Sequence, residues 1–102
     1  MIVHIVLLRI RSNVLMKDVE KVFAAFGALR QRIPGITGYS WGAYSSPEGL
    51  NRGFTHAFCM GFQDARSRDG YLAHPEHHKA VNLAMSVIEG GVEGVLTFDY
   101  AA

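Results

Sequence analysis

The chain has 102 residues, enough for one domain whose hydrophobic core needs neither a disulfide nor a structural metal. Hydrophobic residues make up 49% and charged residues 19% of it, which indicates a globular protein and excludes a disordered one. The formal net charge is +1 and the longest basic cluster is Arg9-Ile10-Arg11, so the sequence lacks the positive charge that binds nucleic acid or an anionic membrane.

The only cysteine is Cys59, which excludes an intramolecular disulfide and favours a reducing compartment. The apolar residues 1–8 have no basic region before them and no small-residue cleavage site after them, so we expect a strand and not a signal peptide. No apolar run approaches the roughly 18 residues of a membrane-spanning helix. The sequence therefore predicts a cytoplasmic protein with a single domain over residues 1–102.

The first half of the chain predicts a strand, a helix and a second strand. Residues 2–11 are apolar and rich in β-branched side chains, which is typical of a strand. Residues 16–33 have apolar side chains at helical spacing, and Pro34-Gly35 ends this helix. Residues 36–46 are rich in aromatic side chains and predict a second strand, and residues 46–53 form a turn-rich loop.

The second half predicts a strand, two helices and a last strand. The helix junction has clear signals, because Pro75 suits a first helical position and His74 stands where an N-cap belongs. Gly90-Gly91 interrupts the chain after the second of these helices. The predicted ranges are 54–62 for the strand, 64–72 and 75–88 for the helices, and 92–100 for the last strand.

The order β-α-β-β-α-β predicts an α+β, ferredoxin-like fold, in which the helices cover one face of a four-stranded antiparallel sheet. The first and third strands nevertheless carry apolar or small side chains on both faces. A short chain without a second domain can cover the free face with a second copy of itself. We therefore expect a homodimer through this sheet face, which carries Val3, Ile5, Leu7, Ala57 and Cys59.

Histidine and tyrosine side chains indicate acid/base chemistry in an apolar pocket between helices and sheet. Tyr71 and His77 lie on either side of the helix junction, and His4 shares a strand face with large apolar side chains. A histidine takes up a proton near neutral pH, and a tyrosine hydroxyl can stabilise an enolate. Tyr71, His77 and His4 are therefore the predicted catalytic residues. The predicted substrate-binding residues are His56, Phe26, Phe58, Val6 and Leu8.

Each of these polar residues also has a structural interpretation. His4 is as consistent with a hydrogen-bonded core histidine as with a pocket residue. The sequence favours a structural role for His56 and, on spacing alone, a packing role for Tyr71. His74 and His78 are spaced to bind a metal across one helical turn, but no cysteine or carboxylate cluster completes such a site. The sequence therefore predicts neither a metal nor another cofactor. Alternation along the last strand also points Asp99 to the helix side of the sheet.

Four segments together resemble the stress-responsive dimeric α/β barrel (Dabb) family. They are His4 to Leu8, Ser46 to His56, Tyr71 to His77 and Phe98 to Tyr100, and the likeness spans essentially the whole chain. The resemblance implies a homodimer in which two four-stranded sheets pack into a barrel.

The resemblance also implies residue roles. One plant member of the family closes a linear polyketide thioester by an aldol condensation without a metal or organic cofactor. Its catalytic tyrosine and histidine match Tyr71 and His77, and two further histidines of its site match His4 and His56. Two functions follow as alternatives. The first is a homodimer that binds a small hydrophobic carbonyl compound, with aldol-type cyclase or lyase chemistry; the second is a non-catalytic, stress-related homodimer without small-molecule turnover.

Overall fold

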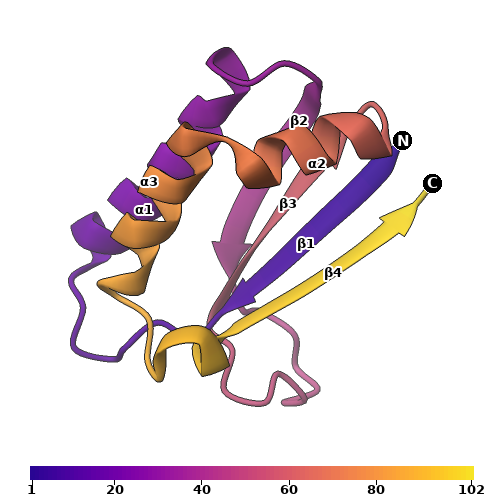
Figure 1. Cartoon of the computed structure of the whole chain (residues 1–102). Coiled ribbons are helices and arrows are strands. Elements are labelled where there is room, and N and C mark those ends of the chain that lie inside the picture. The colour runs from indigo at the N-terminus through magenta and orange to yellow at the C-terminus, as the bar shows by residue number, and fades with distance from the viewer.

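A computed structural model describes residues 1–102 and consists of one antiparallel sheet with helices on one of its faces (Figure 1). The strands, in their order across the sheet, are β2 (Ile36–Ala43), β3 (His56–Phe62), β1 (Ile2–Leu8) and β4 (Val95–Ala101). The helices are α1 (Met16–Ala28), α2 (Ala65–Ala73) and α3 (Pro75–Met85), with short 3₁₀ helices η1 (Leu29–Gln31) and η2 (Gly91–Gly94). This is the ferredoxin-like α+β arrangement, so the predicted fold is confirmed.

The end of α3 differs from the sequence prediction, because the helix stops at Met85 and not at Ile88. The backbone N–H of Arg11 donates to the carbonyl of Val87 at 2.9 Å, and Ile88 pairs with Ile10 in an isolated β-bridge. Backbone bonds to the continuation of β1 thus replace the helical ones after α3.

The last strand also begins later than predicted, at Val95 and not at residue 92. Gly90 and Gly91 have φ angles of 78° and 61°, in the left-handed region that glycine adopts without strain. They turn the chain into η2, which occupies the residues before the strand.

The hydrophobic core lies between the helices and the sheet. α1 contributes Val22 and Phe23, and β3 contributes Phe58, Met60 and Phe62. Alternation on the strand and helical spacing on α1 point these side chains into the same layer. Full burial of each such side chain stabilises the fold by about 1.5–3 kcal/mol, so this layer holds the helices in place on the sheet.

The opposite face of the sheet is apolar and has no helix over it. On β4, Leu96, Phe98 and Tyr100 are 43%, 61% and 48% exposed. In the centre of this face, Ile5 of β1 lies opposite Cys59 of β3 and Phe98 of β4. A single chain therefore leaves a contiguous apolar sheet face exposed to solvent.

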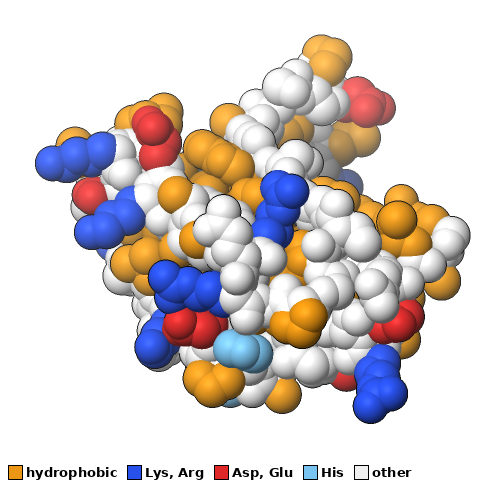
Figure 2. All heavy atoms as spheres, turned by 90° about the horizontal axis from the view of Figure 1, so that it is seen from above, with side chains coloured by type: hydrophobic (Ala, Val, Ile, Leu, Met, Phe, Trp, Pro, Cys, Tyr) orange, Lys and Arg blue, Asp and Glu red, His pale blue; other side chains and the backbone are white.

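Charges of both signs lie on the end of the molecule that carries α2. Figure 2 views the end of the molecule at which α2 lies and shows acidic and basic side chains interspersed, without a continuous patch of one sign. None of the helices has the length and hydropathy needed to cross a membrane.

Candidate functional site

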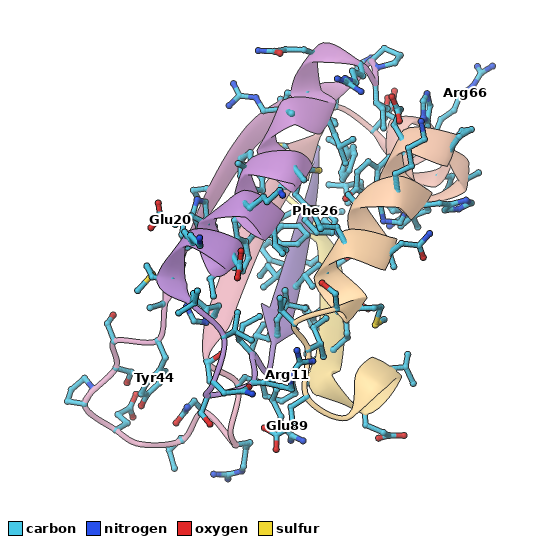
Figure 3. All side chains as sticks on the ribbon, turned by 90° about the vertical axis from the view of Figure 1, so that its left-hand side faces the viewer. Arg11, Glu20, Phe26, Tyr44, Arg66 and Glu89 are labelled. Atoms are coloured by element: carbon cyan, nitrogen blue, oxygen red, sulfur yellow. The ribbon has the colours of Figure 1, made fainter.

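A cavity of about 180 Å³ lies on the helix side of the sheet, beneath α3 and between α1 and the strands β1 and β4. Figure 3 shows Phe26 pointing from α1 into the space beside α3. Most of the lining side chains are apolar, and the polar ones are His4, Tyr71, His77 and Thr97. The lining also includes Val6, Leu8, Phe26, Phe58, Leu72, Val81, Ala84, Met85, Ile88 and Val95. Mostly apolar walls with a few polar groups are typical of small-molecule sites.

His4 is buried in the middle of β1 and is 5% exposed. Its Nδ1 lies 2.6 Å from Oδ1 of Asp99, which is directly opposite on β4. An ionised carboxylate only accepts hydrogen bonds, so this contact assigns the hydrogen to Nδ1. In the neutral ring, Nε2 therefore carries the lone pair.

Tyr71 is the buried polar side chain that comes from α2. The Asp64 side chain caps this helix by accepting a hydrogen bond from the Ser67 backbone N–H at 2.8 Å, which fixes where the helix begins. Tyr71 is 0% exposed, and its hydroxyl has no hydrogen-bond partner in the protein. Burial, and secondarily the nearby Tyr39, raise the pKa of this hydroxyl, so it stays protonated at neutral pH.

His77 comes from the first turn of α3 and lies beside Tyr71. The junction before it is tight, because His74 ends α2 and its side chain also caps α3 by accepting from the Glu76 backbone N–H at 3.1 Å. The rings of Tyr71 and His77 have centroids 4.3 Å apart. The predicted N-cap at His74 is therefore confirmed, and it brings the two rings together across the helix corner.

The surroundings of His77 favour a neutral imidazole. Its Nδ1 lies 3.3 Å from the Leu72 carbonyl, which only accepts, so Nδ1 carries the hydrogen and Nε2 is free. Burial lowers the pKa of His77, the nearby imidazoles of His78 and His4 lower it further, and the Leu72 hydrogen bond partly opposes them. At pH 7 the ring is therefore a neutral base with an available lone pair.

The structure brings the predicted site residues together with one exception. His4, Tyr71, His77, Phe26, Phe58, Val6 and Leu8 all line the cavity. His56 does not, although it is on the same face of the sheet. It lies toward α1 and β2, with its ring centroid 5.8 Å from that of Phe23 and its Nδ1 2.8 Å from the Thr55 hydroxyl. Alternation identified its face correctly but not its position across the sheet, and burial lowers the pKa of this histidine too.

Two charged side chains of the site were not among the predicted site residues. Alternation had pointed Asp99 toward the helices, and the structure confirms this, but its pairing with His4 depends on strand register. Arg68 of α2 donates to Asp99 Oδ2 at 3.0 Å, and its only sequence signal is its spacing of three residues from Tyr71. No group of three or more His, Cys, Asp or Glu side chains lies close enough to hold a metal ion.

Comparison with known proteins agrees with this fold. Olivetolic acid cyclase of Cannabis sativa is 25% identical over 97 residues, which cover 95% of this chain and 92% of the cyclase. A dimeric ferredoxin-like protein of unknown function from Jannaschia sp. CCS1 has a TM-score of 0.88 at 24% identity, with 99% and 98% of the two chains covered. A similar dimeric protein from Thermobifida fusca YX has a TM-score of 0.75 at 25% identity, with 99% and 90% covered.

The family comparison covers nearly every residue. The model of the stress responsive A/B barrel domain, Dabb, matches residues 2–102, which include the whole sheet and all the cavity-lining residues. The chain therefore belongs to the stress-responsive A/B barrel domain (Dabb) family.

Proposed function

We propose that this protein binds a small hydrophobic carbonyl compound in the cavity and carries out cofactor-free, aldol-type acid/base chemistry on it. The observation that carries the proposal is the buried Tyr71 hydroxyl, which has no partner in the protein and lies beside His77. Buried polar groups are rarely left unpaired, and those that are often mark sites where a ligand or water supplies the partner. The 25% identical relative, olivetolic acid cyclase, is by its name an enzyme that forms a ring, which supports a ring-forming reaction of this type.

The size of the cavity limits the part of the ligand that it can enclose. Its volume is about 180 Å³, and an engineered apolar cavity of about 150 Å³ holds one benzene molecule. The enclosed part of the ligand is therefore a single ring or a short acyl chain. Phe26, Phe58, Val6 and Leu8 contact its apolar atoms, and Tyr71 donates a hydrogen bond to its carbonyl oxygen.

In the proposed reaction, His77 is the base. Its Nε2 removes a proton from the carbon next to the carbonyl, and the Tyr71 hydroxyl donates a hydrogen bond to the enolate oxygen that forms. The enolate carbon then attacks a second carbonyl, forming the new carbon–carbon bond, and the proton held by His77 passes to the resulting alkoxide. Acid/base catalysis of this kind contributes roughly 10²–10⁴-fold in rate. His4, oriented by Asp99, is a polar support on the opposite wall.

The assembly that we propose is a homodimer through the open sheet face, in which two sheets form the barrel. Its support is the exposed apolar row on β4 and the dimeric state of the Thermobifida fusca relative. Changing Ile5 to Asp places a charge at the centre of that face and is expected to dissociate the dimer. Light scattering measures the outcome, and an 11.2 kDa monomer for the unchanged protein at micromolar concentration would contradict the assembly. We place this homodimer in the cytoplasm, on the ground of its single cysteine.

Proton exchange on acetophenone tests the chemistry without knowledge of the natural substrate. In D₂O, the protein is expected to accelerate replacement of the methyl protons by deuterium, as followed by NMR. His77→Ala is expected to lower this rate by about 10²–10⁴-fold because it removes the base. His78→Gln is the matched control, since it changes the neighbouring exposed histidine and keeps His77.

Binding of the same probe tests the role of Tyr71. Tyr71→Phe is expected to weaken acetophenone binding by about 0.5–1.5 kcal/mol, the value of one hydrogen bond, and to leave ethylbenzene binding unchanged. Equal effects on both compounds would show that Tyr71 only packs. This result, together with absent exchange, would favour the alternative of a non-catalytic homodimer, for which the complete burial of Tyr71 in the core is the supporting observation.

A further inference from the structure

α2 presents a second polar side chain to the site, in addition to Tyr71. Arg68 is three residues before Tyr71, so both lie on the face of the helix that packs against the sheet. The Arg68 guanidinium reaches β4, where Nη1 donates to Oδ2 of Asp99 at 3.0 Å, and its Nε donates to Oδ1 of Asp69 at 2.9 Å. The Arg68 side chain is 24% exposed, so the contact with Asp99 is partly shielded from water.

The Asp99 carboxylate is held from two sides. Its Oδ1 accepts from His4 Nδ1 at 2.6 Å, while its Oδ2 accepts from Arg68. With both oxygens engaged by donors on different elements, rotation of the carboxylate about its terminal bond breaks at least one bond. The orientation of Asp99, and with it the hydrogen bond that orients the His4 ring, therefore depends on Arg68.

Charge balance around His4 depends on Arg68 in the same way. The groups that face this ring are Asp99 from β4, Tyr71 and, through Asp99, Arg68 from α2, and His77 from α3. An ionised carboxylate that is alone with a histidine favours the protonated imidazolium. The Arg68 guanidinium supplies the positive charge that the carboxylate needs, so that His4 does not have to supply it.

We propose that Arg68 is a positioning residue of the site, which acts through Asp99 to keep His4 as a neutral ring with its hydrogen on Nδ1. The Nε2 lone pair of His4 is then ready to accept a hydrogen bond from a ligand in the cavity that this residue lines. The use of this lone pair in catalysis rests on the proposed function. The state of the His4 ring does not, because the relay of hydrogen bonds exists without a ligand.

Nitrogen NMR of the histidine rings in the ligand-free 102-residue protein tests the proposal. The ¹⁵N shifts of Nδ1 and Nε2 report which nitrogen carries a hydrogen, and His4→Gln assigns the His4 signals. At pH 7.5 the unchanged protein is expected to show His4 with only Nδ1 protonated. In Arg68→Leu the Nε2 signal is expected to move toward its protonated position, because the ring becomes an imidazolium or exchanges between tautomers.

The matched control is Arg66→Leu, which removes the same charge from the same helix. Arg66 is exposed and points away from the molecule (Figure 3). It is expected to leave the His4 signals unchanged, whereas Arg68→Lys, which keeps the charge but not the planar fork, is expected to shift them less than Arg68→Leu. If Arg68→Leu does not fold, Arg68→Lys and Arg68→Gln provide the same comparison.

Unchanged His4 signals in the folded Arg68 variants would overturn the proposal, as would a wild-type His4 with its hydrogen on Nε2 alone. The acetophenone experiment tests the proposed chemistry independently of the role of Arg68. A confirmed relay without proton exchange on acetophenone would reject the proposed chemistry and leave Arg68 as the residue that sets the state of His4.

Discussion

Each half of the helix-covered sheet face is packed against a tyrosine, partly buried Tyr39 in one half and fully buried Tyr71 in the other, and the two hydroxyls have different surroundings. On the β2 side, the Tyr39 hydroxyl donates to the Phe23 carbonyl at 2.6 Å, and the Trp41 ring stacks on Phe23 with centroids 4.5 Å apart. On the β4 side, the Tyr71 hydroxyl has no partner and lies against the cavity. Burial raises the pKa of both hydroxyls. The Tyr39 hydroxyl thus stabilises the fold through a hydrogen bond, whereas the Tyr71 hydroxyl is free to bond to a ligand.

This difference has an energetic meaning. A buried hydroxyl without a partner costs about 1–3 kcal/mol, whereas a paired one contributes about 0.5–1.5 kcal/mol. The paired Tyr39 hydroxyl therefore stabilises the β2 half, whereas the unpaired Tyr71 hydroxyl makes the β4 half less stable. Substitutions in the two halves are expected to have correspondingly different effects.

The largest expected effect is on the β2 side. Phe23 is fully buried and contacts Trp41 and Phe58, so Phe23→Ala is expected to lower the free energy of unfolding by about 3–5 kcal/mol. Denaturant unfolding measures this. Leu72→Ala is the control and is expected to cost much less, because Leu72 lines the cavity but is 42% exposed. Similar losses for both would mean that the two halves are equally important to stability.

A matched pair of substitutions compares the two hydroxyls directly. Tyr39→Phe removes a made hydrogen bond and is expected to destabilise the protein by about 1 kcal/mol. Tyr71→Phe removes an unpaired hydroxyl and is expected to be neutral or to stabilise by up to about 1 kcal/mol. Thermal or chemical unfolding distinguishes the two. A loss for Tyr71→Phe as large as that for Tyr39→Phe would show that the Tyr71 hydroxyl has a permanent partner in solution.

The smallest expected effect is a pH dependence. Burial lowers the pKa of His77 in the folded protein below the value of about 6.5 expected in the unfolded chain. Below pH 6.5 the unfolded chain therefore binds more protons, so stability is complete above this pH and falls as the pH drops toward the folded pKa. Melting temperatures between pH 8 and 5 measure the fall. His77→Gln is expected to make it shallower. His78→Gln removes only a minor contribution to the lowered pKa of His77 and is expected to change the fall less; the opposite order would exclude His77 as its source.

The fold could be predicted from periodicity because each element follows its own local rule. Alternation pointed His4 and Asp99 to the same side of the sheet, and helical spacing pointed Val22 and Phe26 inward, as the structure confirms. The element ends could not be predicted as well. The end of α3 depends on hydrogen bonds to Arg11, which is distant in the sequence.

The candidate site could be predicted where it depends on sheet face and helix junction, but not where it depends on position across the sheet. Tyr71 and His77 meet because a short junction separates them, and this is visible in the sequence. His56 shares a face with His4 and still belongs to the other half of the molecule. The role of Arg68 could not be predicted, because a charged residue on a short helix usually faces water and its partner Asp99 is 31 residues away.

The single-residue corner between α2 and α3 has a consequence for the length of the chain. His74 serves as the end of one helix and the cap of the next, so the junction has no slack. One added residue at the start of α3 would rotate the side chains after it by about 100° and carry His77 away from Tyr71. The loop between β2 and β3 has no such constraint, since lengthening a surface loop costs little. Insertions are therefore expected to be tolerated between residues 44 and 55 and rejected between residues 71 and 77.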